Sequence, residues 1–186
     1  MSATLIIGGA RSGESALAER LAHESGKEIV YVATALAGDG EMGARIVHHR
    51  ARRPGHWRTV EESLLLAGVL RHECRSDRLV LVDCLTLWLT NLMLSGEEPL
   101  PEMGELVLPP RFERERAAVL DLLDADLPGE LILVSNEVGM GIVPMGALTR
   151  RFVDEAGRLN QEVAARAERV ILVAAGLPLV MKGTPC

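Results

Sequence analysis

Residues 4–15 of the chain read TLIIGGARSGES, an apolar run followed directly by a glycine-rich segment. The run predicts a buried β-strand, the glycines predict a tight turn, and the residues after them predict a helix. A strand, a glycine-rich turn and a helix in this order cradle phosphate groups, because backbone N–H groups and the helix N-terminus attract anions. The spacing from Gly8 through Gly13 to Ser15 is that of a P-loop, except that Glu14 stands where a P-loop has lysine.

The whole loop is a candidate site for a nucleotide and its Mg²⁺ ion. Ser15 is placed to offer a hydroxyl to the ion, and Asp83, at the end of the apolar run LVLVD, is placed like the Walker B acid that holds it directly or through water. The alternative is a glycine-rich turn that only caps an ordinary helix. The candidate nucleotide-binding residues of the loop are Gly8, Gly9, Ala10, Arg11, Ser12, Gly13, Glu14 and Ser15.

Glu14 is an anion at the position where phosphate oxygens are expected. At about 4 Å and an effective dielectric near 20, the lost and reversed interaction is worth roughly 4 kcal/mol. Because about 1.4 kcal/mol is tenfold in affinity, uncompensated triphosphate binding weakens by orders of magnitude. Arg11, Lys182, an arginine elsewhere or a metal ion bridging Glu14 and phosphate could compensate, and the sequence does not choose among them.

Apolar runs and amphipathic stretches alternate along the chain. Continuously apolar runs predict strands buried on both faces, so the alternation predicts a mainly parallel, doubly wound α/β sheet in one domain over residues 1–186. Ligands of such sheets bind at the carboxyl ends of the strands, where the glycine-rich loop, Thr34, Asp83 and SNEVGMG (135–141) should share one edge. We expect strands at 4–7, 29–33, 79–82, 131–134, 170–174 and 177–180, and helices at 14–25, 41–52, 61–75, 85–94, 111–123 and 147–167.

Composition excludes several classes of protein. The 186 residues carry a formal net charge of −6, whereas a general nucleic-acid binder usually presents a basic face. No apolar run approaches the length of a membrane span, and the first residues lack the layout of a signal peptide. The three cysteines are far apart, which favours reduced thiols over disulfides or a zinc site. We therefore expect a cytoplasmic protein without a membrane span or a nucleic-acid partner.

Two further segments are candidates for chemistry. His48 and His49 precede several arginines including Arg53, and a neutral imidazole is a competent nucleophile toward phosphorus. The alternative is a pair of surface histidines at a solvated helix end. The segment NEVGMGIVP (136–144), which contains Glu137, has the composition of a shaped loop near a ligand, or of a plain strand-to-helix connection.

Five segments, in this order, resemble the adenosylcobinamide kinase / adenosylcobinamide-phosphate guanylyltransferase family of cobalamin biosynthesis. The histidine segment and the NEVGMGIVP loop, after a P-loop-like start, are the most specific of them. The resemblance runs nearly end to end. The chain departs from the family's pattern at Glu14, where the family has lysine. The segments are GGARSG (8–13), RIVHHRARRPGHWRT (45–59), DCLTLWLTN (83–91), SNEVGMGIVP (135–144) and RFVDEAGRLNQEVA (151–164).

The resemblance implies two activities on a P-loop domain of the RecA-like group, assembled as a homo-oligomer, typically a trimer. The kinase phosphorylates the aminopropanol hydroxyl of adenosylcobinamide with ATP or GTP. The guanylyltransferase moves GMP from GTP, through a guanylylated histidine that corresponds to His48, onto that phosphate to give adenosylcobinamide-GDP. Arg53 and Glu137 are expected at the nucleotide, and Ser15 and Asp83 at Mg²⁺.

Two other functions stay open on the residues alone. The first is an impaired or non-catalytic nucleotide-binding homologue, which Glu14 favours. The second is a kinase of another small alcohol, which leaves the histidine pair unexplained.

Overall fold

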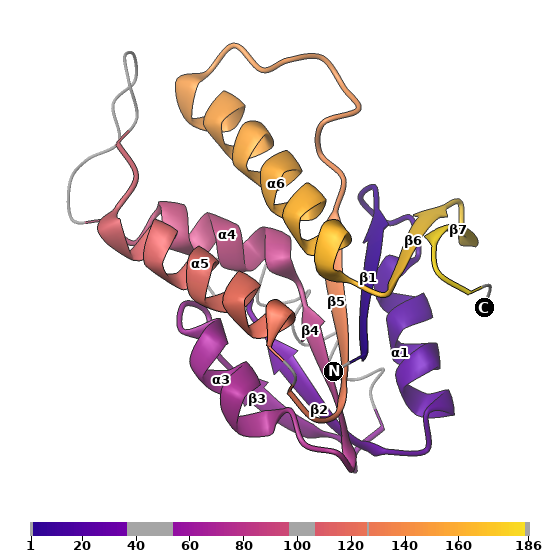
Figure 1. Cartoon of the computed structure of the whole chain (residues 1–186). Helices are drawn as coiled ribbons and strands as arrows, with labels where there is room; N and C mark the ends of the chain where they lie inside the picture. Colours follow the sequence, from indigo (N-terminus) through magenta and orange to yellow (C-terminus); the bar gives the residue numbers. More distant parts are fainter. Residues whose placement is uncertain (1, 37–53, 97–106, 126, 185–186) are drawn as a thin grey trace.

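A computed structural model describes residues 2–36, 54–96, 107–125 and 127–184 of the chain (Figure 1). Its centre is a sheet of seven strands in the order β3-β2-β4-β5-β1-β6-β7. Every pairing is parallel except that of β6 with β7. The strands are β1 (Ser2–Gly8), β2 (Glu28–Ala33), β3 (Arg58–Glu61), β4 (Arg78–Asp83), β5 (Glu130–Asn136), β6 (Arg169–Ala174) and β7 (Leu177–Lys182).

Helices cover both faces of this sheet, as the apolar runs predict (Figure 1). Among the described residues, one face packs against four helices around the fully buried Trp88, and the other against α1 around Ile6 and Ile171. The expected doubly wound α/β architecture is therefore confirmed. The helices are α1 (Glu14–Glu24), α3 (Leu66–Glu73), α4 (Leu85–Met93), α5 (Pro110–Asp124) and α6 (Ala147–Arg166).

The antiparallel edge is a tight hairpin. Ala175 and Gly176, the two residues between β6 and β7, both have positive φ, at 52° and 78°. Two such residues form a type I′ turn, whose twist matches that of the strands it joins. The turn lies at the same end of the sheet as the carboxyl end of β1 (Figure 1).

Sequence and structure differ between β2 and β4. The strand β3 was not predicted, and the helix expected from residue 61 begins at Leu66 as α3. Glu61 instead pairs with Ala33 at the end of β3. The Glu62 carboxylate accepts hydrogen bonds from the N–H groups of Leu64 and Leu65, each at 2.8 Å, and so stabilises a turn in place of the first helical turn. The helix expected at 41–52 lies outside the described residues.

Within the described ranges, no helix is long and apolar enough to cross a membrane.

We predict that Gly129→Ala destabilises the fold. Gly129 has φ 97°, and a Cβ there would lie 2.3 Å from the carbonyl oxygen of Arg75, so both backbone strain and a backbone clash oppose alanine. The strain alone costs about 1–3 kcal/mol, which in a chain of this size lowers Tm by roughly 2–4 °C per kcal/mol. Thermal unfolding followed by circular dichroism measures the change.

Gly157→Ala in α6 is the matched control, since a Cβ there meets nothing within 4 Å. Alanine in a helix interior stabilises by about 0.5–1 kcal/mol relative to glycine, so this variant should melt at or above the parent. A Gly129→Ala variant as stable as Gly157→Ala would contradict the prediction.

Candidate functional site

The carboxyl ends of β1, β2, β4 and β5 meet at one edge of the sheet, as expected. The Thr34 hydroxyl donates to the Cys84 carbonyl at 2.7 Å and accepts from the Cys84 N–H at 2.8 Å, which joins the end of β2 to that of β4. The Glu137 N–H donates to the Gly8 carbonyl at 2.9 Å, which joins the segment after β5 to the end of β1. The residues that follow these strands are therefore joined in two pairs, β2 with β4 and β1 with β5.

The glycine-rich loop between β1 and α1 is tightly folded. A Cβ at Gly8 would lie 2.0 Å from the Ser12 hydroxyl oxygen, so only glycine lets the loop close over the strand end. Gly13, at φ 105°, precedes Glu14, the first residue of α1. The Gly176 N–H of the β6–β7 turn donates to the Ser12 carbonyl at 2.7 Å and supports the loop from the side. The Leu17 N–H donates to the Gly13 carbonyl at 3.0 Å, whereas the first N–H groups of a helix, here those before Leu17, have no carbonyl partner within the helix and are available to an anion.

Glu14 is turned into the site. It is buried, with 9% of its surface exposed. Its Oε2 accepts a hydrogen bond from the Ser12 hydroxyl at 2.7 Å, and its Oε1 accepts one from the Asn136 side-chain amide at 3.3 Å. The carboxylate therefore connects the loop after β1 to the end of β5.

Asp83 lies at the end of β4 and is half-buried. The Tyr31 hydroxyl donates to its Oδ2 at 2.8 Å, which orients the carboxylate. Burial, with the Asp83 charge beside it, raises the pKa of the Cys84 thiol to about 12, so this cysteine is a neutral thiol in the fold.

The described residues contain no group of three or more His, Cys, Asp or Glu suited to a metal ion. The half-buried Asp83 carboxylate, oriented by Tyr31, is nevertheless the kind of ligand that Mg²⁺ takes, since this ion binds one or two carboxylates and completes its shell with water and substrate phosphates.

A buried polar network fixes the end of β5. The Asn136 N–H donates to the Thr86 hydroxyl at 2.7 Å, and the Ser135 hydroxyl donates to the Asn160 side-chain oxygen at 2.7 Å. The Asn160 amide in turn donates to the Asn136 carbonyl at 3.3 Å. Sequence reasoning missed these roles, although polar residues interrupting the apolar stretches LTLWLTN and RLNQEVA were a usable signal.

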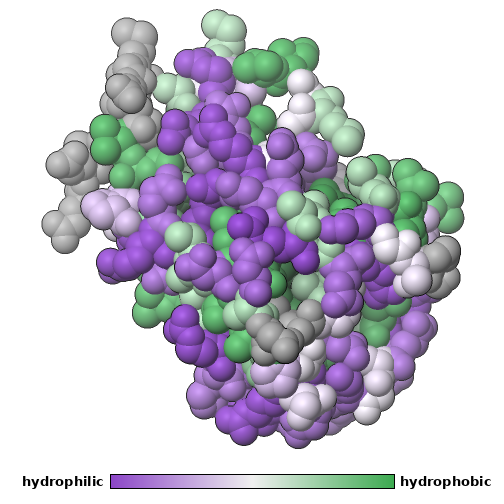
Figure 2. Space-filling model, in the orientation of Figure 1, coloured by the Kyte–Doolittle hydropathy of each residue, from purple (hydrophilic) through white to green (hydrophobic). Residues whose placement is uncertain are grey.

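Glu137 shapes the segment between β5 and α6. Its Oε1 accepts from the Gly139 N–H at 2.6 Å. Beyond it the segment exposes Met140, Ile142 and Met145, at 80%, 98% and 94% of their surfaces. Figure 2 shows hydrophobic side chains gathered in this upper region of the molecule. Exposed apolar side chains in such a group are typical of a binding surface.

The remaining candidate residues are Arg11, Lys182, Arg53 and His48. Arg11 is on the loop and exposed, whereas His48 and Arg53 lie outside the described residues. The hypothesis that Lys182 replaces the P-loop lysine is wrong. Its Nζ donates to the carbonyls of Ala164 and Ala165 at 3.0 and 2.9 Å, at the end of α6. Because β7 runs antiparallel to β6, its last residue lies beside the start of β6, at the end of the sheet opposite to the glycine-rich loop.

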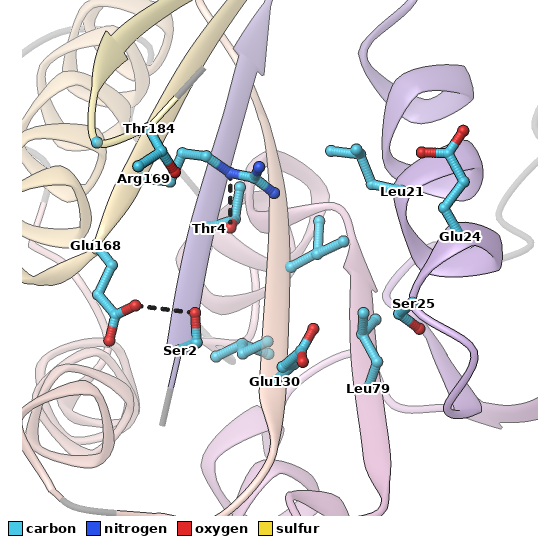
Figure 3. Close-up of a pocket in the computed structure, with 13 residues that line it drawn as sticks. Ser2, Thr4, Leu21, Glu24, Ser25, Leu79, Glu130, Glu168, Arg169 and Thr184 are labelled. Atoms are coloured by element: carbon cyan, nitrogen blue, oxygen red, sulfur yellow. Dashed lines mark hydrogen bonds between the residues drawn. The ribbon is translucent and has the colours of Figure 1, made fainter. Parts of the chain in front are cut away.

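A hollow of about 520 Å³ also lies at that opposite edge (Figure 3). It is formed where β1, β5 and β6 begin and where α1 ends. Figure 3 shows Arg169 reaching over this hollow, with its Nε donating to the Thr4 hydroxyl at 3.4 Å. Three carboxylates, those of Glu24, Glu130 and Glu168, line it and disfavour phosphate. The hollow is therefore separate from the glycine-rich loop.

Solved structures share the fold. An ATPase from the type III secretion system of pathogenic bacteria superimposes with a TM-score of 0.56 at 14% identity, over 96% of this chain and 56% of that chain. The ATP synthase subunit NeqB from Nanoarcheaum equitans gives 0.52 at 14% identity, over 93% and 47%. This chain thus spans about half the length of these structures, and the similarity concerns the fold alone. It confirms the expected fold, a mainly parallel sheet flanked by helices.

Two bacterial relatives match over nearly the whole chain. The "Bifunctional adenosylcobalamin biosynthesis protein CobP" of Pseudomonas aeruginosa is 59% identical over 181 residues, 97% of this chain and 98% of that protein. The "Bifunctional adenosylcobalamin biosynthesis protein CobU" of Salmonella typhimurium is 40% identical over 179 residues, 96% of this chain and 98% of that protein. The profile of the family described as "Cobinamide kinase / cobinamide phosphate guanyltransferase" matches residues 4–181. The chain belongs to this cobinamide kinase / cobinamide phosphate guanyltransferase family.

Proposed function

We propose that the protein is a bifunctional adenosylcobinamide kinase and adenosylcobinamide-phosphate guanylyltransferase. The single observation that carries this proposal is the whole-length match to bifunctional relatives, up to 59% identical. The geometry supports it, because the glycine-rich loop, Asp83 and the segment after β5 lie at the carboxyl ends of neighbouring strands in a mainly parallel sheet. The proposed substrates are GTP or ATP and adenosylcobinamide.

In the kinase reaction, the aminopropanol hydroxyl oxygen attacks the γ-phosphorus of the nucleotide. The bond from that phosphorus to the β,γ-bridging oxygen breaks, the hydroxyl proton passes to water, and the nucleoside diphosphate is released. The role of the chain is to position the triphosphate along the loop Gly8–Ser15 and to offer N–H groups to its charge.

In the guanylyltransferase reaction, an imidazole nitrogen of His48 attacks the α-phosphorus of GTP and pyrophosphate leaves. A phosphate oxygen of adenosylcobinamide phosphate then attacks the same phosphorus, the phosphorus–nitrogen bond breaks, and adenosylcobinamide-GDP forms. Arg53 and Glu137 are proposed to contact the nucleotide. Two steps through a covalent intermediate replace one difficult displacement.

Ser15 and Asp83 are the residues that would hold Mg²⁺ with the nucleotide. The ion supplies charge neutralisation at the phosphates. The support is the half-buried Asp83 carboxylate, oriented by Tyr31 at 2.8 Å, at the end of a strand on the same edge as the loop.

A second candidate function is an impaired nucleotide-binding homologue. The observation that favours it is the inward-turned Glu14 carboxylate, which occupies the loop with contacts to Ser12 and Asn136. The labelling experiment below separates the two candidates.

We also propose that the protein assembles as a homo-oligomer, a trimer by family resemblance, and acts in the cytoplasm. The first is supported by an apolar row on the edge strand β7, where Leu177, Leu179 and Met181 expose 72%, 62% and 63% of their surfaces. The second is supported by Cys74 and Cys84, which are buried free thiols.

We predict that GTP labelled at the α-phosphate, incubated with the protein and Mg²⁺, leaves a covalent label that is acid-labile and alkali-stable. A phosphoramidate on histidine has this stability pattern. The label should disappear in His48→Ala and persist in the adjacent control His49→Ala. No label in the native chain but label in Glu14→Lys would favour the impaired homologue. A label that survives in His48→Ala would contradict the proposed nucleophile.

Asp83→Asn should slow guanylylation by roughly 100-fold at fixed Mg²⁺, since about 3 kcal/mol of charge stabilisation is lost with the ion's carboxylate ligand. The initial rate of labelling across a Mg²⁺ titration measures the effect. Tyr31→Phe, which removes only the hydroxyl that orients Asp83, should give a smaller loss. Asp77→Asn, an exposed acid that precedes β4, should change nothing, and an unchanged rate in Asp83→Asn would argue against this assignment.

Light scattering after size-exclusion chromatography should give a mass near three times the 20.1 kDa of one chain. Leu179→Glu places a charge in the exposed row of β7 and should lower this mass by opening the interface, while its fold is retained because the side chain is already solvated. Leu65→Glu, at a separate exposed leucine, is the control. A native chain that elutes as a monomer would refute the assembly.

A further inference from the structure

The Glu14 carboxylate is held by specific hydrogen bonds at the glycine-rich loop. Both of its oxygens accept hydrogen bonds, one from the loop itself through Ser12 and one from a different strand through Asn136. The carboxylate is thus held from two sides. An acid that only favoured the N-terminus of α1 through the helix dipole would need neither partner.

The Ser12 hydroxyl is likewise held inside the loop, by its hydrogen bond to Glu14. It lies where a Cβ of Gly8 would stand, 2.0 Å from that ideal position, and it donates to Glu14 at 2.7 Å. The loop is thus closed around its own carboxylate, and a donor of the loop is used inside the chain. A phosphate that enters must separate this pair and then face the negative charge of Glu14.

Asn136 sets the direction of the Glu14 side chain. In the register of β1 and β5, Asn136 lies opposite Gly8, the residue from which the loop leaves the sheet. Its backbone is fixed by the Thr86 hydroxyl and the Asn160 amide, so its side-chain amide is presented to Glu14 from a rigid strand end. Asn136 therefore acts through Glu14 as a positioning residue.

We propose that Glu14 is an internal anion that closes the phosphate loop, and that Asn136 holds it in this closed position. The proposal rests on the proposed function only in taking the loop as the nucleotide site. A free triphosphate meets the full repulsion, whereas the magnesium complex carries two fewer negative charges. The charge of Glu14 thus makes the loop select the metal-bound nucleotide over the free nucleotide.

The test is the equilibrium affinity for GTP, measured by isothermal titration calorimetry in Mg²⁺ and in EDTA at matched ionic strength. Glu14→Gln keeps the shape of the side chain and an acceptor for Ser12 but removes the charge. It should bind GTP at least tenfold more tightly than the native chain in EDTA, with a smaller gain in Mg²⁺. Asn136→Ala keeps the charge and frees the carboxylate, so its affinity should lie between those of the native chain and Glu14→Gln.

Glu24→Gln is the matched control, because it removes the same charge from the exposed far end of α1. It should bind GTP like the native chain in both media. The proposal is overturned if Glu14→Gln binds no more tightly than the native chain in EDTA, if its gain is as large in Mg²⁺ as in EDTA, or if Glu24→Gln shows the same gain. Thermal melts verify that each variant is folded. If Asn136→Ala does not fold, the affinities of Glu14→Gln are sufficient to test the proposal.

The calorimetric titration measures GTP binding and requires no chemical step. A chain that never labels His48 can still show the expected order of affinities, and a chain that labels His48 can fail to show it. Failure of the proposed function and failure of the loop closure are therefore distinguishable.

Discussion

The parallel pairing of β1 with β5 is the constraint on which the site depends. Its register runs from Ser2 opposite Glu130 to Gly8 opposite Asn136. The two strands thus end at the same level, so the loop that leaves β1 and the segment that leaves β5 start side by side. The hydrogen bond from the Glu137 N–H to the Gly8 carbonyl continues this pairing past the last ladder positions. A shift of this register by one residue would turn Asn136 to the other face of the sheet.

Burial makes this pairing rigid. β1 lies between β5 and β6 in the sheet, and Leu5 and Ile6 are fully buried on its two faces. Close-packed interiors transmit a displacement instead of absorbing it. The polar network of Thr86, Ser135 and Asn160 extends the same rigidity to the strand end, where satisfied buried hydrogen bonds specify one arrangement. The site is thus held by the core from below and by the β6–β7 turn from the side.

The sequence predicted most of this architecture, because continuous apolar runs mark buried parallel strands with little ambiguity. All six expected strands are present, whereas β3 was missed because RTVE alternates and is only four residues long. Lys182 was one of several cations considered in place of the P-loop lysine, because the direction of β7 cannot be read from its composition. The contact between Glu14 and Asn136 joins residues 122 positions apart, and only the pairing of β1 with β5 brings them together. Sequence reasoning recognised both residues as members of loops but had no means of pairing them.

Glu14 shows how an acid at the lysine position of a phosphate loop is accommodated by its surroundings. A buried carboxylate is unfavourable unless its oxygens are hydrogen-bonded, and Ser12 and Asn136 supply those bonds. The interactions that make Glu14 compatible with the fold are the ones that a phosphate must disrupt. Stability of the empty loop and affinity for the nucleotide are therefore opposed in this chain. A local rule broken at a binding site, with the compensation found in its immediate contacts, is the pattern expected where function and folding make different demands on one residue.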